Sequence, residues 1–273
     1  MWVIRFLTAA LPALSVILWG SAGVGLLGFV LLAGSQPARA DVIELRASHW
    51  CPFSCSPDSP RPGLLVELAR EALALFGHEV RYANLSWSRS LAQVQTGAVN
   101  GIIGPDLYKI NSLIFSAPMI LHQESLAFRS GETRPVTGPQ DLEGLQLGAV
   151  QDYRHAPSLA QYMARHKADP TRVQLLSGED GAGRNLRKLM SRRIDLVLEE
   201  RSVLIYTARR LGLSDQIEIL PYGEVDALHI GFSPALESSR LYARQFNAGL
   251  VQLQQSGRYH DILASYRQVE ATP

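Results

Sequence analysis

Cysteine is nearly absent from this chain. Its 273 residues include only two cysteines, and both lie in the segment SHWCPFSC at residues 48–55. The seven histidines are scattered and form neither an H-x3-H nor an HExxH pattern, so they offer no further zinc ligands at a suitable spacing. Three interpretations of Cys51 and Cys55 are open at this point: a redox or metal motif, a small structural staple, or a chance pairing.

An excess of charge of either sign is also lacking. The chain carries 26 basic and 25 acidic residues, and only three of the basic residues are lysines. Neither a polybasic stretch nor an acidic tail is present in the sequence. We therefore do not expect nucleic acid to be a partner.

The first 40 residues predict export. Residues 6–34 contain no charged side chain, and the segment QPARA that ends at Ala40 places small residues at its third and fifth positions. This pattern predicts a signal peptide over residues 1–40 that is cleaved after Ala40. Because the uncharged run is longer than the usual apolar region of a signal peptide, an uncleaved membrane anchor is the alternative.

Export favours one interpretation of the two cysteines. Outside the cytosol, a cysteine pair forms a disulfide more often than a thiol redox site or a zinc site. A bridge between Cys51 and Cys55 closes a very small loop, so its entropic contribution to stability is only about 2 kcal/mol. Its role would be to rigidify the loop that holds Trp50 and Phe53. We therefore predict a structural disulfide.

The spacing of apolar residues predicts a first α/β lobe. Within residues 63–77 the apolar side chains recur at helical spacing, and Gly77 ends the run. The predicted elements are a strand at 42–48, a helix at 63–77, a strand at 78–85, a helix at 86–97 and a strand at 99–104. This β-α-β-α-β order predicts a parallel sheet whose strand-to-helix loops meet at one edge.

The same alternation then repeats. Predicted strands lie at 145–150, 172–176, 194–199 and 216–220, predicted helices lie at 158–167, 183–192 and 202–212, and a long helix at 233–257 and a short one at 258–267 follow. The segments 124–130 and 225–233 are extended in character and flank this second lobe. We therefore predict an α/β fold of two lobes, each a mainly parallel sheet flanked by helices, joined by two hinge strands.

The two lobes define the expected place of a site. We expect the first lobe to comprise residues 41–126 and 227–273, and the second lobe to comprise residues 127–226. Open α/β sheets bind ligands at the carboxyl ends of their strands, so two facing lobes place a site in the cleft between them. Two hinge strands would allow the cleft to close around a ligand.

Several segments together resemble a known family. They are WCPF at 50–53, PGLLVELAREAL at 62–73, WSRSLAQVQTGAVNGIIG at 87–104, FSAP at 115–118, DLEGLQLGAVQDY at 141–153 and SRRIDLVLEE at 191–200. In order and spacing the chain resembles the periplasmic solute-binding proteins of family 3, the amino-acid-type receptors of ABC transporters, over nearly all of residues 41–267. The resemblance implies a monomeric periplasmic receptor with the type II periplasmic-binding fold. Such a receptor binds a small molecule, uses no cofactor or metal, and delivers its ligand to an ABC permease in the inner membrane.

The resemblance also implies site residues. Lys109 takes the position of the arginine that clamps a ligand carboxylate in the family, and Glu200 matches the acidic residue that binds the α-ammonium group. Arg154 could supply the anion contact that a lysine at position 109 weakens. The ligand-binding residues that we expect are Trp50, Phe53, Trp87, Arg89, Gly104, Lys109, Gln151, Tyr153, Arg154 and Glu200.

Other interpretations stay open for these residues. The aromatic side chains could pack in the core, and the charged ones could lie on a solvated surface. Two further functions are also possible on this scaffold. One is a periplasmic dehydratase resembling cyclohexadienyl dehydratase, with Glu199 or Glu200 as proton donor if burial raises its pKa. The other is a membrane-tethered accessory protein that senses a ligand.

Overall fold

The first lobe is built on a five-stranded sheet. The computed structural model describes residues 40–106, 110, 112–151, 153, 155–178 and 180–269, and the side chains up to residue 266. The strand order is β2-β1-β3-β10-β4, with bounds β1 Val42–Ala47, β2 Glu79–Asn84, β3 Gly101–Ile103, β4 Ile114–Phe115 and β10 Ile230–Phe232. Strand β1 pairs in parallel with β2 and β3, whereas β10 runs antiparallel to β3 and β4. Four of the five strands therefore point the same way.

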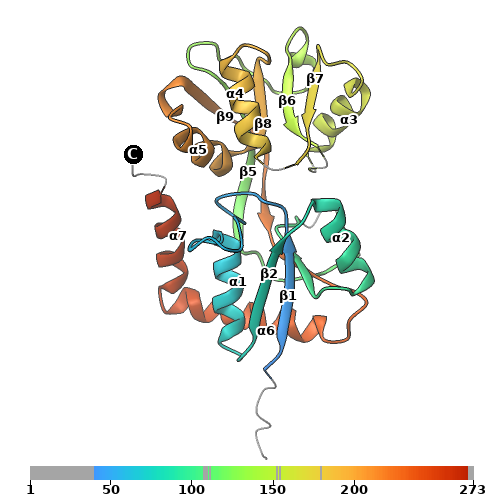
Figure 1. The fold of residues 1–273 in the computed structure, drawn as a ribbon, viewed down its shortest axis with the longest axis vertical. Helices are drawn as coiled ribbons and strands as arrows, with labels where there is room; N and C mark the ends of the chain where they lie inside the picture. Colours follow the sequence, from blue (N-terminus) through green and yellow to red (C-terminus); the bar gives the residue numbers. More distant parts are fainter. Residues whose placement is uncertain are drawn as a thin grey trace, which may run out of the picture. The chain divides into compact units, whose positions relative to one another are not determined.

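Four helices flank this sheet (Figure 1), and their bounds are α1 Leu64–Ala74, α2 Trp87–Thr96, α6 Ser239–Gln255 and α7 Arg258–Val269. Helix α6 approaches α1 very closely. A Cβ atom at Gly249 of α6 would lie 2.1 Å from the backbone oxygen of Ala72 in α1. Only glycine permits this contact, which brings Phe246 of α6 into the same core as Leu65 and Leu73 of α1.

The second lobe repeats the plan of the first. Its strand order is β7-β6-β8-β5-β9, with bounds β5 Ile120–Arg129, β6 Leu147–Val150, β7 Val173–Leu176, β8 Leu196–Glu200 and β9 Ile217–Leu228. The helices are α3 Pro157–His166, α4 Gly181–Met190 and α5 Arg201–Arg210, with short 3₁₀ turns η2 Pro139–Leu142 and η3 Ser214–Gln216. Strand β6 is parallel to β7 and β8, and β5 is antiparallel to β8 and β9.

The long strands β5 and β9 connect the lobes. They pair antiparallel from Ile120 opposite Leu228 to Arg129 opposite Ile217, with one irregularity between Gln123 and Ser125. Leu228 belongs to the hydrophobic core of the first lobe, whereas other residues of the same two strands belong to cores of the second lobe. The two strands are therefore the hinge segments that the sequence predicts.

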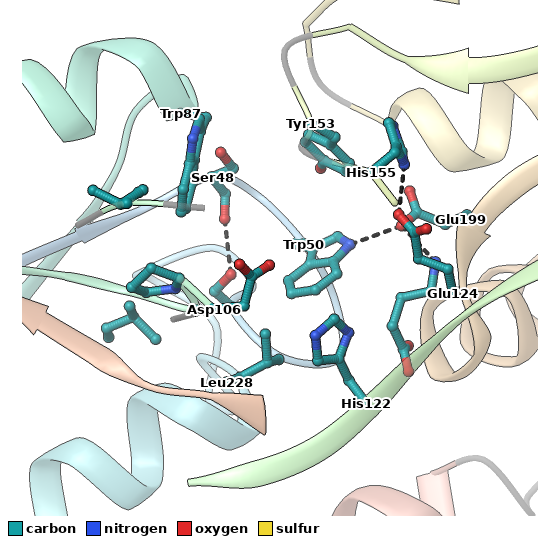
Figure 2. A pocket seen from close by; sticks show the side chains of 16 residues that line it. Ser48, Trp50, Trp87, Asp106, His122, Glu124, Tyr153, His155, Glu199 and Leu228 are labelled. Carbon is teal, nitrogen blue, oxygen red and sulfur yellow. Dashed lines mark hydrogen bonds and ion pairs between the residues drawn. The ribbon is translucent and has the colours of Figure 1, made fainter. Parts of the chain in front are cut away.

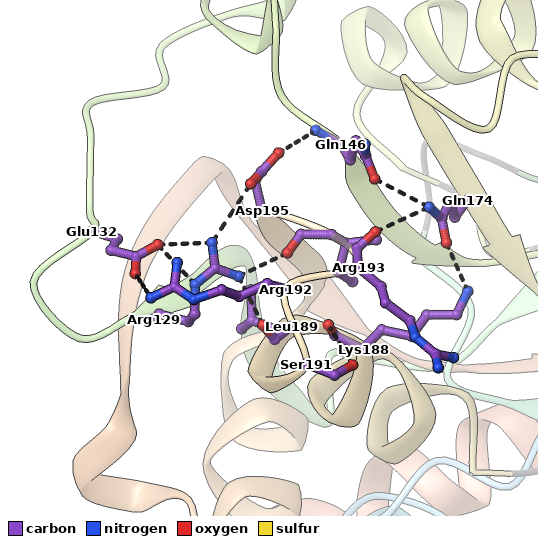
Figure 3. Close-up of polar contacts among 11 residues, drawn as sticks. Arg129, Glu132, Gln146, Gln174, Lys188, Leu189, Ser191, Arg192, Arg193 and Asp195 are labelled. Carbon is purple, nitrogen blue, oxygen red and sulfur yellow. Dashed lines mark hydrogen bonds and ion pairs between the residues drawn. The ribbon is translucent and has the colours of Figure 1, made fainter.

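A buried arginine secures the far end of β5 (Figure 3). Arg129 is 8% exposed, and its Nη1 donates to the backbone oxygens of Leu189 at 2.7 Å and Ile194 at 2.8 Å. Its Nε donates to Glu132 at 2.7 Å, and Asp195 lies 3.5 Å from its Nη2. These bonds tie β5 to the end of α4 and the start of β8, so the strand is anchored in the second lobe.

The fold class predicted from the sequence is confirmed, with three corrections of detail. Each sheet is mixed, because β10 in the first lobe and β5 in the second run against their neighbours. The strand predicted at 216–220 continues to Leu228 as β9, since β5 offers it a partner along its whole length. The long helix predicted from residue 233 begins at Ser239, because Ser233 precedes a proline and its hydroxyl accepts from the backbone N–H of Ala235 in a turn.

The signal peptide cleaved after Ala40 and its alternative, an uncleaved membrane anchor, remain predictions. The leader over residues 1–40 lies, except for Ala40, outside the described residues. Among the described residues, no helix combines the length and the apolar character needed to span a bilayer.

Candidate functional site

A cavity lies between the two lobes, with about 720 Å³ of empty space including its open mouth. Its walls come from the loop after β1, the start of α2, the loop after β3, the hinge strands and the ends of β6 and β8. The lining residues are Ser48, Trp50, Ser54, Trp87, Ile103, Gly104, Pro105, Asp106, Ile110, His122, Glu124, Tyr153, His155, Glu199, Glu200 and Leu228.

Trp50 stands in the middle of the cavity (Figure 2) and reaches from one lobe to the other. Its loop is closed by the predicted disulfide between Cys51 and Cys55, which is confirmed, and by a hydrogen bond from its backbone N–H to the oxygen of Ser54 at 2.6 Å. The indole Nε1 donates to Oε1 of Glu199 at 3.0 Å. A side chain of the first lobe is thus bonded to a carboxylate of the second.

Other aromatic rings surround this indole. Tyr153 approaches Trp50 edge-on with ring centroids 6.2 Å apart, and Phe53 lies behind it at 4.8 Å. Burial, together with the nearby charge of Glu199, raises the pKa of the Tyr153 hydroxyl well above its usual range. Trp87 lines the opposite part of the cavity (Figure 2), and its buried Nε1 has no hydrogen-bond partner among the described residues. Three aromatic side chains, Trp50, Tyr153 and Trp87, therefore line the cavity.

Two consecutive glutamates form the wall of the second lobe. They end β8, whose five residues are all buried, and their exposed fractions are only 3% for Glu199 and 5% for Glu200. Glu200 is also the N-cap of α5, and its Oε2 accepts from the backbone N–H of Val203 at 3.0 Å. Glu199 accepts from the backbone N–H of Glu200 at 2.8 Å in addition to the Trp50 indole.

Burial controls the protonation of both glutamates. Loss of water raises the pKa of Glu199, and the hydrogen bonds from Glu200 and Trp50 only partly oppose this effect. Burial likewise raises the pKa of Glu200 to about 8 from an ordinary value of 4.5, and the neighbouring charge of Glu199 adds to the rise. A positive charge in the cavity would reverse both shifts, because it would stabilise the ionised carboxylates.

A third carboxylate lies beside this pair. Glu124 of β5 stands directly opposite Glu200 in the sheet. Its Oε1 is 2.7 Å from Nδ1 of His155, and its Oε2 accepts from the backbone N–H of Ala156 at 3.1 Å. The pair joins the hinge strand to the loop before α3, so it fixes one side of the cavity.

The described lining is acidic. It holds the carboxylates of Asp106, Glu124, Glu199 and Glu200, and the only basic side chains among its described residues are His122 and His155. Lysine and arginine are absent from the lining within the part of the chain that the structure describes.

The structure brings together five of the ten predicted ligand-binding residues, which line the cavity: Trp50, Trp87, Gly104, Tyr153 and Glu200. Gly104 has φ of +91°, a conformation that favours glycine, and a Cβ atom there would lie 3.9 Å from the Trp50 ring. Lys109 and Arg154 lie outside the described residues, so the anion contacts that we expect of them remain predictions.

Three predicted residues do not line this cavity. Phe53 is 3% exposed and packs in the core of the first lobe, where it supports Trp50 from behind. Arg89 is exposed in the first turn of α2, and Gln151 is exposed after β6. Each lies two positions from a lining residue in the chain, Trp87 or Tyr153, and is exposed to solvent.

Sequence reasoning missed Asp106, Glu124 and His155 as members of the site. Each is a single polar residue outside any recognisable motif, and each comes from a different segment. The alternation of His122 and Glu124 on an extended segment was the one available signal, because residues two apart in a strand share a face.

Comparison with known proteins identifies the fold. No protein-family model matches the chain, and no curated protein matches it by sequence. Solved structures do match. One is a histidine kinase sensor domain with similarity to periplasmic binding proteins, with 18% identity and a TM-score of 0.67 over 84% of this chain and 96% of that one.

Two further matches are transport receptors. An amino acid ABC transporter substrate-binding protein from Streptococcus pneumoniae, bound to L-arginine, has 15% identity and a TM-score of 0.65 over 86% of this chain and 98% of that one. An ABC uptake transporter substrate-binding protein from the same species, with bound histidine, has 18% identity and a TM-score of 0.66 over 82% and 92%. The protein therefore has the two-lobed fold of the periplasmic binding proteins, as the sequence predicts.

Proposed function

We propose that the protein is an exported receptor that binds a small amine-bearing solute between its lobes and does not alter it. The observation that carries the proposal is a wall of three carboxylates, in which Glu199 and Glu200 are buried and Glu124 is partly buried. Buried carboxylates are costly unless they meet a positive charge or a proton. A cationic solute would meet this need, and its binding would then release the protons that burial retains on the two consecutive glutamates.

The aromatic side chains support the same proposal. Trp50 and Tyr153 lie beside Glu199, so an ammonium or guanidinium group that reaches this carboxylate also reaches their rings. Cations bind aromatic faces with about 0.5–2 kcal/mol, and more strongly where water is excluded. The Nε1 of Trp87, which has no hydrogen-bond partner within the described part of the chain, would serve as a donor to a polar oxygen of the same solute.

Delivery to an ABC permease is the use that we propose for this binding. Structures with this fold include receptors of ABC transporters with bound arginine and bound histidine, and both ligands are amines. A monomeric, periplasmic protein fits the predicted leader and the described lobes. A sensing role is the alternative, since a histidine kinase sensor domain shares the fold.

A ligand screen tests the proposal. The full chain would be heated with L-arginine, L-histidine, putrescine or succinate, and its melting temperature recorded. A ligand at about 100 times its dissociation constant adds about 2.7 kcal/mol of stability, which raises the melting temperature measurably. We expect the amines to stabilise the protein and succinate to leave it unchanged. Stabilisation by succinate alone would contradict the proposed charge of the solute.

A matched pair of variants locates the amine. Glu200→Gln keeps the shape of the side chain and removes its charge, whereas Glu237→Gln changes an exposed carboxylate outside the cavity. Hydrogen bonds to charged groups contribute about 1.5–3 kcal/mol, so the first variant should bind the stabilising amine about 10–100 times more weakly in calorimetry. The second variant should bind it as the natural chain does.

A second candidate function is favoured by the raised pKa values of Glu199 and Glu200. A cleft carboxyl group that is still protonated near neutral pH is suited to protonate a leaving group. This is the dehydratase interpretation of the same scaffold. Incubation of the protein with prephenate and with arogenate tests it, because turnover yields an aromatic product that absorbs in the ultraviolet. Absence of product at high protein concentration would leave the receptor as the function.

A further inference from the structure

We propose that Asp106, His122 and Asp226 bind a divalent transition-metal ion at the hinge side of the cavity. Each of the three side chains offers one ligand atom, and these atoms all lie within 4.8 Å of one another. Asp106 is buried, and His122 and Asp226 are partly buried. The set is separate from the carboxylate wall of the second lobe, and Asp226 is not among the residues that line the cavity.

The backbone holds all three residues in place. His122 of β5 stands directly opposite Asp226 of β9 in the antiparallel ladder, and directly opposite side chains lie on one face with Cβ atoms about 4.5–5.5 Å apart. Asp106 follows β3 in a loop that is bonded to His229, through the N–H of Gly104 at 2.9 Å and the oxygen of Pro105 at 3.1 Å. The three ligands thus come from three fixed segments.

The Asp226 carboxylate is also oriented. Its Oδ1 accepts from the backbone N–H of Ala227 at 2.7 Å. Such outer hydrogen bonds are typical of carboxylates that bind metals, because they fix the ligand before the ion arrives.

The chemistry of the donors selects the kind of ion. One imidazole nitrogen and two carboxylates suit Zn²⁺, Mn²⁺, Fe²⁺ or Co²⁺, whereas Ca²⁺ and Mg²⁺ prefer oxygen ligands alone. Metal–ligand bonds of about 2.1 Å, at the angles of about 90–110° of octahedral or tetrahedral sites, place neighbouring ligand atoms about 3–3.5 Å apart. Side-chain movements of up to about 2 Å would bring the three groups to that distance.

Three protein ligands leave coordination positions open. Asp106 and His122 also line the cavity, so these positions would face the bound solute. A metal ion here would supply a positive charge on the hinge side of a cavity whose opposite wall is acidic. This inference goes beyond the proposed function and does not depend on it, because metal binding is measured without any organic solute.

Direct titration tests the site. The full chain would be purified with a histidine-free tag, treated with EDTA and dialysed, and then titrated with Zn²⁺ and with Mn²⁺ in a calorimeter. Co²⁺ would be followed by its visible absorption. We expect one equivalent to bind. Because loss of an outer hydrogen bond alone weakens metal sites about 10–100-fold, His122→Asn and Asp226→Asn should each weaken binding at least about tenfold.

Two control variants match these changes. His260→Asn removes an exposed histidine of α7, and Glu224→Gln removes an exposed carboxylate of β9 two residues before Asp226. Both should bind the ion as the natural chain does. If His122→Asn or Asp226→Asn fails to fold, as judged by circular dichroism, Asp106→Asn is used in its place.

Two results would overturn the proposal. One is the absence of saturable binding of all three ions, and the other is unchanged affinity in the folded site variants. Failure of the proposed solute would be recognised separately, because the amine screen can be run with EDTA present throughout.

Discussion

Glu200 should make the protein less stable as the pH rises. Burial raises the pKa of this side chain to about 8 in the folded protein, from an ordinary value of 4.5. Between these two values the folded state holds a proton that the unfolded state has lost. Its contribution to stability is therefore complete below about pH 4.5 and is lost as the pH rises through about 8.

The magnitude follows from the size of the shift. One pKa unit corresponds to about 1.4 kcal/mol, so the free energy of unfolding should fall by about that amount per pH unit within this window. A rise from 4.5 to about 8 then corresponds to an upper value of about 5 kcal/mol. This is a large part of the stability of an ordinary domain.

The assay compares the natural chain with Glu200→Gln in urea titrations at pH 5, 6, 7, 8 and 9. Glutamine mimics the protonated side chain and does not titrate. The free energy of unfolding of the variant should therefore fall with pH less steeply than that of the natural chain, by about 1.4 kcal/mol per pH unit. Glu199 and Glu124 face Glu200 and remain in both proteins, so the difference between the two profiles isolates Glu200. Parallel profiles between pH 5 and 8 would refute the reasoning.

Three further perturbations follow from the packing. Replacing Cys51 and Cys55 together by serine should lower the free energy of unfolding, measured in urea titrations, by about 2 kcal/mol. It should also weaken solute binding, and unchanged binding would show that the loop does not need the disulfide. Gly249→Ala places a Cβ atom 2.1 Å from the backbone oxygen of Ala72 in α1. We therefore expect the free energy of unfolding to fall by about 1–3 kcal/mol, and a melting temperature equal to that of the natural chain would contradict this. Trp50→Phe keeps an aromatic ring but removes the donor to Glu199. The free energy of unfolding should fall by about 1–3 kcal/mol, and an unchanged value would argue against this bond.

Local pattern was sufficient to predict most of the fold. The buried strand and helix faces of the first lobe follow simple periods, as in Leu64–Ala74, where seven side chains are buried along one face. Strand β9 shows where local pattern fails. Pro221 and Gly223 interrupt its sequence, yet β9 is an edge strand of its sheet, where a proline is tolerated. Its pairing with β5 is a tertiary contact, which the spacing of apolar residues within β9 does not reveal.

The site was predictable only where a residue belongs to a recognisable segment. Trp50 and Glu200 lie in the segments that resemble the family, and both line the cavity. Asp106, Glu124 and His155 meet because a loop, a hinge strand and the start of a helix converge, and their neighbours in the chain carry no sign of this. Spatial convergence of single polar residues requires the fold itself.

The position of the indole rings has a practical consequence. The chain has four tryptophans, and two of them, Trp2 and Trp19, belong to the predicted leader. The other two, Trp50 and Trp87, both line the cavity. If the leader is cleaved after Ala40, as the sequence predicts, the remaining tryptophan fluorescence comes from these two residues of the cavity, so the protein carries its own unlabelled optical reporter of whatever enters it.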